Sequence, residues 1–220
     1  MPDIDVEAYF QYGDTEIRYL QHACPKMAAA IESIGPVQRA IIPDIYSALI
    51  NSIVGQQISS KALVTVWGRF TARFSPMTPE SVAAVSAEAL QKLGISMRKA
   101  LYILELTNHV LEGQLDLEAL QNLPDEEVCQ RLCAIKGIGV WTAEMLMIFS
   151  MQRPDIMSYG DLAILRGLRM LHRHRVITPQ LFQKYKRRYS PYGSVASLYL
   201  WAIAAGELEG LTDPARKKTK

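Results

Sequence analysis

The amino-acid sequence predicts an all-α fold. Apolar residues recur at helical spacing through most of the 220 residues, and several of these segments follow a Ser or Thr suited to a helix N-cap. The sequence holds neither a sustained alternation of apolar and polar residues nor an Asn-Gly hairpin signal, so β-strands are not expected. We expect about ten short helices.

Two amphipathic helices are expected early in the chain. The segments "DIYSALINSIVG" (44–55) and "SSKALVTVWGRF" (59–70) each gather apolar residues on one helical face. These residues are Ile45, Leu49, Ile50, Ile53 and Val54 in the first segment, and Ala62, Leu63, Val66, Trp67 and Phe70 in the second. Both faces are expected to pack into a core.

Further helices are marked by their first residues. Thr78 and Thr178 each precede a proline, the combination that favours an N-cap followed by the first helical position. The segment 86–94 runs from a serine cap to a glycine stop, and the segment 96–113 does the same. These four caps predict four helix starts.

The segment 124–150, which contains "KGIGVWTAEML", predicts two helices joined by a tight turn. The first helix is expected from 124 to about 134 and the second from about 140 to 150, with Gly137 and Gly139 in the turn. Glycines there leave the amides at the start of the second helix uncovered, which favours an anion such as a nucleic-acid phosphate. Glycines also serve many helical hairpins for packing alone.

Trp141 and Asp161 each allow two interpretations. Trp141 lies in the first turn after the glycines, where it serves either as a core anchor or as a face presented to a cleft. Asp161 in "YGDLAI" precedes an apolar helix, so it is either an N-cap or a carboxylate that stabilises a cationic transition state.

Composition and charge narrow the class of protein. The chain is 49% hydrophobic and 21% charged, as in ordinary globular proteins. Its N-terminal residues do not show a basic region followed by an apolar run, and no apolar run is long enough to span a bilayer. We therefore expect a cytoplasmic protein. Residues 1–130 hold 9 Lys/Arg and 16 Asp/Glu, a net −7, whereas residues 131–220 hold 15 and 6, a net +9. The basic part indicates either a polyanion partner or a solvated face.

Three cysteines cannot build a disulfide framework. Cys129 and Cys133 are spaced as helical core positions, with a two-ligand metal clip as the alternative. His172 and His174 are expected on a solvated face.

Four segments in this order resemble one protein family. "ALINSIVGQQISSKA" (48–62), "LCAIKGIGVWTA" (132–143), "YGDLAI" (159–164) and "PYGSVASLYLW" (191–201) are similar to the helix-hairpin-helix (HhH-GPD) DNA glycosylases, most closely to the AlkA type. The resemblance covers roughly residues 10–210. It implies a two-lobed fold: one helical lobe at 46–158 with the hairpin at about 124–150, a second lobe from 1–45 plus 159–220, and an active-site cleft between the lobes. The tail 214–220 is expected to be a disordered basic segment.

The resemblance implies roles for single residues. Asp161 matches the catalytic aspartate, and Trp141 stands where bifunctional relatives carry a Schiff-base lysine. The implied pocket for the substrate base consists of Trp141, Trp201, Met145 and Leu162. Met145 and Leu162 stand where AlkA-type pockets can be aromatic, which bears on substrate breadth.

The resemblance also implies DNA and cation contacts. The implied DNA-binding groups are Gln56 and Gln57 in the inserting segment and the amides of Gly137, Gly139 and Val140. Gln57 takes the position of the wedge, where a relative has an apolar residue. The carbonyls of Cys133, Ile135 and Ile138 are implied ligands of a Na⁺ or K⁺ ion. No cofactor is expected for catalysis, and no iron-sulfur cluster, because the four spaced C-terminal cysteines of that branch are lacking.

The implied activity is base excision repair. A monofunctional glycosylase would flip alkylated purines (3-methyladenine, 7-methylguanine) out of double-stranded DNA and hydrolyse them, leaving an abasic site; we expect it to act as a monomer and, in a bacterium, at the nucleoid. The alternatives are a bifunctional glycosylase/lyase for oxidised bases, a non-catalytic helix-hairpin-helix DNA-binding module, and a helical protein-interaction domain.

Overall fold

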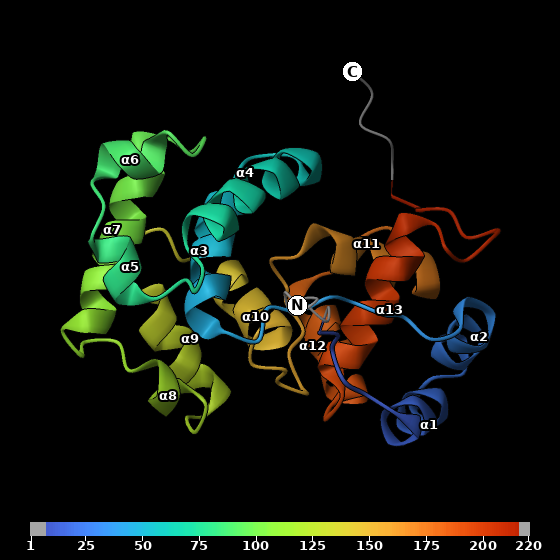
Figure 1. Cartoon of the computed structure of the whole chain (residues 1–220). Coiled ribbons are helices and arrows are strands. Elements are labelled where there is room, and N and C mark those ends of the chain that lie inside the picture. The colour runs from blue at the N-terminus through green and yellow to red at the C-terminus, as the bar shows by residue number, and fades with distance from the viewer. Residues whose placement is uncertain (1–7, 216–220) are drawn as a thin grey trace, which may run out of the picture. The chain divides into compact units, whose positions relative to one another are not determined.

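The computed structural model of the chain describes residues 8–215 and is all-α, which confirms the predicted fold class (Figure 1). The described residues form thirteen helices, and the only extended pairing among them is an isolated bridge between Tyr9 and Ala40. This number exceeds the approximately ten helices predicted, partly because the sequence analysis names no helix in residues 14–34, where the structure has two. Of the tail predicted to be disordered, residues 216–220 lie outside the described part.

The described chain divides into two compact units. Residues 42–151 form one, and the described residues of 1–41 and 152–220 form the other. The functional lobes expected at 46–158 and at the two chain ends stay a prediction. Across residues 8–215, the structure holds no helix that is both long and apolar enough to span a membrane.

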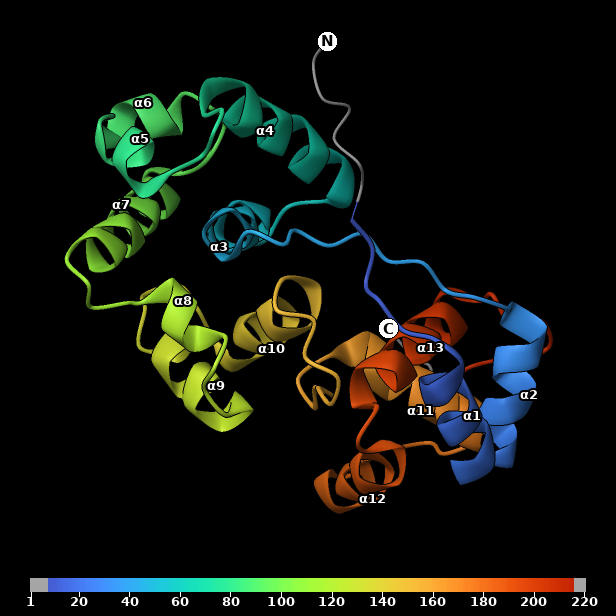
Figure 2. The same cartoon turned by 60° about the horizontal axis from the view of Figure 1, so that its bottom comes forward.

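The first unit packs around the predicted apolar face. Its helices are α3 (Ile45–Gly55), α4 (Ser60–Arg73), α5 (Pro79–Ala83), α6 (Ala87–Gln91), α7 (Met97–Leu111), α8 (Leu117–Leu120), α9 (Asp125–Cys133) and α10 (Val140–Phe149). Helix α3 contacts α4, α7 and α10 (Figure 2). Its predicted face is buried, with Leu49, Ile50, Ile53 and Val54 fully so. On α4 only Val66 and Phe70 of the predicted face are buried, and the other three residues are half-buried.

The four predicted caps are present. The hydroxyls of Thr78, Ser86, Ser96 and Thr178 each accept a hydrogen bond from the amide three residues on. Each bond satisfies one of the amides that a helix start leaves without an intrahelical acceptor. The helix after Ser86 ends at Gln91, ahead of the predicted glycine stop.

The second unit is built around its last helix. Its helices are α1 (Asp14–Ala23), α2 (Pro25–Ile34), α11 (Leu162–His172), α12 (Pro179–Tyr189) and α13 (Gly193–Ala205). Nearly all of α13 is buried, and it packs along α11 (Figure 1). The two backbones approach at Gly167, where a Cβ atom would lie 2.3 Å from the Leu200 carbonyl oxygen. The close packing of α11 on α13 therefore requires a glycine at this position.

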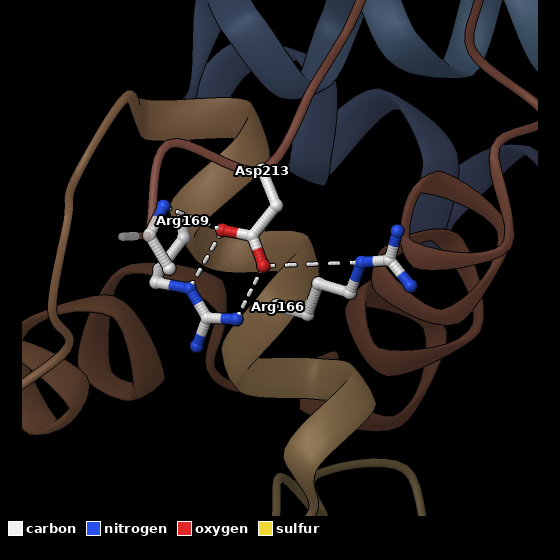
Figure 3. A network of polar contacts seen from close by, with 4 residues as sticks. Arg166, Arg169 and Asp213 are labelled. Atoms are coloured by element: carbon white, nitrogen blue, oxygen red, sulfur yellow. Dashed lines mark hydrogen bonds and ion pairs between the residues drawn. The ribbon is translucent and has the colours of Figure 1, made fainter. Parts of the chain in front are cut away.

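The segment after α13 is fastened to α11 by an ion-pair network (Figure 3). Arg169 donates from Nε and Nη2 to the two carboxylate oxygens of Asp213, at 2.9 and 2.6 Å, and Arg166 Nε lies 3.9 Å from Asp213 Oδ2. The hydrogen bond from Arg169 is the main cause that lowers the pKa of Asp213 to about 2.

Two expectations about side-chain surroundings are wrong. His172 and His174 are half-buried rather than on a solvated face: Nε2 of His172 is 2.9 Å from the Tyr189 hydroxyl, and Nε2 of His174 is 2.7 Å from the Tyr185 hydroxyl. Desolvation lowers the pKa of His172 to about 3. Cys129 and Cys133 are also half-buried instead of core residues, and both are free thiols.

Candidate active site

The hairpin has the form that the sequence predicts. Helix α9 ends at Cys133, α10 begins at Val140, and Gly139 is the N-cap of α10. Gly139 has no side chain, and α10 has no side-chain cap hydrogen bond at its N-terminus. The amides at this N-terminus and the positive end of the helix dipole favour an external anion.

The two turn glycines have different roles. Gly137 has φ +88°, and a Cβ atom there would lie 2.7 Å from the ring of Tyr102, so the turn itself requires glycine. Gly139 has φ −100° and would meet nothing within 4 Å, so the turn tolerates a side chain at this position. The missing side chain of Gly139 therefore leaves the start of α10 accessible.

The connection between α3 and α4 carries the predicted wedge. Gln56 is the C-cap of α3, and its Nε2 donates to the carbonyl oxygen of Gly137 at 2.6 Å. Gln57 follows in the left-handed region, φ +57°, which is uncommon outside glycine. Its side chain is exposed, as is the neighbouring Ile58. The fold thus presents a polar and an apolar side chain together at this tip.

A cavity of about 280 Å³ lies between this connection and α10. Four of the predicted site residues line it, namely Gln56, Gln57, Trp141 and Met145. Trp141 is 49% exposed, which excludes the interpretation as a core anchor. Met145 is half-buried one turn further along α10. The cavity therefore lies between residues 56–58, called the wedge segment below, and Trp141 of the hairpin.

Asp161 occupies the N-cap of α11 and also contacts α13. Its Oδ1 accepts hydrogen bonds from the amides of Ala163 (2.9 Å) and Ile164 (2.8 Å), and from Nε1 of Trp201 on α13 (3.1 Å). The aspartate is 7% exposed, so its carboxylate is held in one orientation inside the unit. Three hydrogen-bond donors thus surround one carboxylate oxygen at the N-terminus of α11.

The structure brings the predicted site residues together in two groups. In the first unit the cavity residues adjoin the amides at Gly139 and Val140, and in the second unit Asp161 contacts Trp201. Leu162, the first residue of α11, is 80% exposed. The roles of all these residues stay predictions.

The predicted cation ligands flank the hairpin turn. The Ile135 carbonyl accepts a hydrogen bond from the Ile138 amide at 3.1 Å, and a carbonyl oxygen has a second lone pair for a further partner. A set of carbonyl oxygens from Cys133, Ile135 and Ile138 suits a hard cation. Among residues 8–215, no group of three or more His, Cys, Asp or Glu side chains could hold a metal ion.

Two residues on α7 contact this site and were missed. Lys99 Nζ donates to the carbonyls of Val54 (2.8 Å) and Gln56 (2.6 Å), and the ring of Tyr102 lies against Gly137. Desolvation, and secondly the charge of Arg98, lower the pKa of Lys99. The periodicity of α7 carries no signal for these contacts, because they join residues that are 35 or more positions apart.

Comparisons with known proteins identify the family of the chain. Residues 50–191 match the HhH-GPD superfamily of base excision DNA repair proteins. The chain is 34% identical over 178 residues to DNA-3-methyladenine glycosylase 1 of Schizosaccharomyces pombe, covering 79% of this chain and 77% of the relative. It is 27% identical over 173 residues to DNA-3-methyladenine glycosylase 2 of Escherichia coli, covering 72% of this chain and 57% of the relative.

Solved structures show the same fold. The crystal structure of a DNA-3-methyladenine glycosidase from Bacillus halodurans superposes with a TM-score of 0.81 at 36% identity, covering 90% of this chain and 93% of that one. A 3-methyladenine DNA glycosylase of S. pombe in complex with abasic DNA gives a TM-score of 0.75 at 28% identity, over 89% of this chain and 99% of that one. The matched residues include the hairpin, the wedge segment and Asp161. The chain therefore belongs to the HhH-GPD superfamily of base excision DNA repair proteins.

Proposed function

We propose that this protein is a monofunctional DNA glycosylase that removes alkylated purines, 3-methyladenine and 7-methylguanine among them, from double-stranded DNA. The observation that carries the proposal is the buried carboxylate of Asp161, held at a helix N-terminus by two amides and Trp201 in a chain of this superfamily. The names of the relatives, 3-methyladenine glycosylases, support alkylated purines as the substrate class.

The first step is extrusion of the damaged nucleotide. A base inside a duplex is out of reach, so the nucleotide must leave the stack at a cost of a few kcal/mol. The amides of Gly139 and Val140 hold a backbone phosphate, while Gln57 enters the space that the base leaves. Phosphate binding by these amides and insertion of Gln57 together offset the free-energy cost of extrusion and of DNA bending.

Recognition of the base uses its charge. Alkylation at N3 or N7 makes the purine cationic, and a cation is attracted to the face of a tryptophan ring by about 2 kcal/mol when it is desolvated. Trp141, exposed at the start of α10, and Trp201 are the rings that we assign to this contact. Met145 and Leu162 add apolar contacts without aromatic faces, so the preference for cationic bases comes from the two tryptophans.

Asp161 acts on the sugar. As the N-glycosidic bond breaks, the base departs with the bonding electron pair and the sugar develops oxocarbenium character. The carboxylate stabilises this positive charge and orients the water whose oxygen attacks C1′; it also takes up the proton that the water loses. The products are free base and an intact abasic site.

A covalent lyase step is not part of this chemistry. The position of a Schiff-base lysine holds Trp141, and Lys136, five residues earlier, lies with its Nζ 3.0 Å from Glu105 Oε1. Lys99 donates to two backbone carbonyls. We therefore propose hydrolysis without strand cleavage, and not the bifunctional alternative.

Four further expectations belong to the same proposal. The protein acts on double-stranded DNA as a monomer, and it does so in the cytoplasm. A Na⁺ or K⁺ ion held by the hairpin carbonyls of Cys133, Ile135 and Ile138 would neutralise part of their negative charge next to a bound phosphate. Catalysis itself requires no cofactor.

The test is release of free base from methylated duplex DNA, with borohydride trapping in parallel. We expect 3-methyladenine and 7-methylguanine in the supernatant and no trapped covalent complex. A trapped complex would contradict the monofunctional mechanism. Absence of release, with DNA binding retained, would favour the non-catalytic binding module instead.

A further inference from the structure

Helix α7 joins the wedge segment to the hairpin. Lys99, in the first turn of α7, donates from Nζ to the carbonyls of Val54 and Gln56 at 2.8 and 2.6 Å. Both carbonyls lie at the C-terminal end of α3, where a helix leaves carbonyls without intrahelical donors and where a cation is favoured by the helix dipole. The ammonium group thus satisfies the end of α3 and fixes the chain as it leaves that helix.

The same face of α7 reaches the hairpin turn. Tyr102, three residues after Lys99, lies with its ring against Gly137 so closely that a Cβ atom there would be 2.7 Å away. Gln56 completes the connection, because its Nε2 donates to the Gly137 carbonyl at 2.6 Å while its own carbonyl accepts from Lys99. A continuous series of hydrogen bonds therefore runs from Lys99 through Gln56 to the turn.

Gln57 depends on this connection. It follows Gln56 directly and has φ +57°, a left-handed conformation that is unfavourable for a residue with a side chain. Such a conformation persists where the surrounding contacts determine it. Gln57 itself is exposed. The contacts are therefore supplied by the hydrogen bonds that the carbonyl and the side chain of Gln56 make.

We propose that Lys99 is a positioning residue for base extrusion. It holds Gln57 at a set distance from the amides at Gly139 and Val140, so that the wedge and the phosphate grip act on DNA as one rigid unit. The inference rests on the proposed function and adds to it a residue that touches neither DNA nor the reacting atoms. It predicts that Lys99 contributes to extrusion and not to the bond-breaking step.

The test compares Lys99→Met, Lys99→Arg and Arg98→Met, the last a matched control that removes the exposed neighbouring cation. Two duplexes carry 7-methylguanine, one opposite cytosine and one opposite a stable abasic analogue, where the lesion is already unpaired. For Lys99→Met we expect the single-turnover excision rate to fall about tenfold on the paired duplex, because two carbonyls lose their donor, and at most about twofold on the unpaired one. Lys99→Arg should restore most of the rate, and Arg98→Met should change neither.

A solely structural role would give a different result. If Lys99→Met slows excision equally on both duplexes, the proposal is overturned, because the loss then does not depend on extrusion. The thermal unfolding midpoint of each variant shows that a folded protein was compared.

A second readout separates this inference from the proposed function. 2-Aminopurine beside a mismatched pair becomes more fluorescent when a wedge disrupts stacking, whether or not a base is released. If the wild-type protein releases no methylated base, the proposed function fails, but a fluorescence change lost in Lys99→Met and kept in Arg98→Met still supports the positioning role. Equal fluorescence in all four proteins overturns it.

Discussion

The starts of α10 and α11 are two helix N-termini that treat a negative charge in opposite ways. Helix α11 is capped by the carboxylate of Asp161, which accepts from two amides and from Trp201. Helix α10 is capped by Gly139 without any side-chain bond. The N-terminus of α11 thus binds a carboxylate of the protein itself, whereas the N-terminus of α10 has no such side chain and could bind an anion from outside. In the proposed function, the same backbone electrostatics would serve catalysis in one unit and DNA binding in the other.

Removal of the negative charge of Asp161 should have the largest effect on excision. Asn caps a helix about as well as Asp and accepts through the same oxygen, so Asp161→Asn keeps the fold but removes the charge that stabilises the cationic sugar. We expect the single-turnover excision rate to fall about 10²–10³-fold, with affinity for abasic DNA within threefold.

The control is Asp116→Asn, which alters the exposed cap of α8 and should leave excision unchanged. Unchanged excision in Asp161→Asn would show that the carboxylate is a cap alone.

A negative charge introduced at Gly139, at the start of α10, should have the next largest effect. Gly139 has an ordinary φ and open space at its Cβ, so Gly139→Asp makes the start of α10 resemble that of α11. The new carboxylate would cap the helix and repel a phosphate. We expect the Kd for abasic duplex DNA, measured by fluorescence anisotropy, to rise about tenfold. The free energy of unfolding should stay the same or rise by up to about 1 kcal/mol.

Gly139→Ser separates charge from crowding. A neutral hydroxyl caps the helix without repelling the phosphate, so its Kd should rise by no more than about threefold. Equal losses in the serine and aspartate variants would mean that the space at Gly139, and not the open anion site, matters for binding.

Removal of the Trp201 donor should have an effect of similar size, on the excision rate instead of on DNA affinity. Trp201→Phe keeps an aromatic ring on α13 but deletes the Nε1 hydrogen bond to Asp161. A hydrogen bond to a charged group contributes about 1.5 kcal/mol or more, so the single-turnover rate should fall about tenfold. The matched control is Trp67→Phe, at a half-buried tryptophan on α4 that stacks on Phe70. A similar loss in both variants would contradict a specific role for the Trp201–Asp161 bond.

The features predicted from sequence are those that depend on near neighbours. The caps at Thr78 and Ser96, and the bounds of the hairpin helices, follow from signals within a few residues of each other. His172 illustrates the opposite case: its charged neighbours suggested a solvated face, but a tyrosine 17 residues later covers it. The contacts of Lys99 with the end of α3 depend on how α7 packs, which no local pattern encodes.

The role of Asp161 combines both kinds of signal. Its position before an apolar helix predicts an N-cap, and the hydrogen bonds of this cap, from the amides of Ala163 and Ile164, are present. The hydrogen bond from Trp201, 40 residues later, arises only because α13 packs along α11 with glycine at position 167. The resemblance to a family indicated both residues as site residues, whereas no local pattern indicated the contact between them.

The smallest effect is expected for another carboxylate, that of Asp213, which is bound by arginine side chains of α11 instead of helix amides. Because its pKa is lowered from the ordinary 3.8 to about 2, the stability that it contributes is fully present above pH 4 and is lost as the pH falls toward 2. Asp213 and Arg169 are 23% and 21% exposed, so screening limits this contribution to about 1 kcal/mol.

Urea unfolding at pH values from 6 to 2 measures this contribution as the difference between wild type and Asp213→Asn. The variant should be less stable by about 1 kcal/mol above pH 4, and the difference should vanish near pH 2. Asp14→Asn, which breaks an exposed pair with Arg18, should show no measurable difference at any pH. A difference for Asp213→Asn that persists at pH 2 would mean that its hydrogen bond to the Ala215 amide, and not its charge, stabilises the segment after α13.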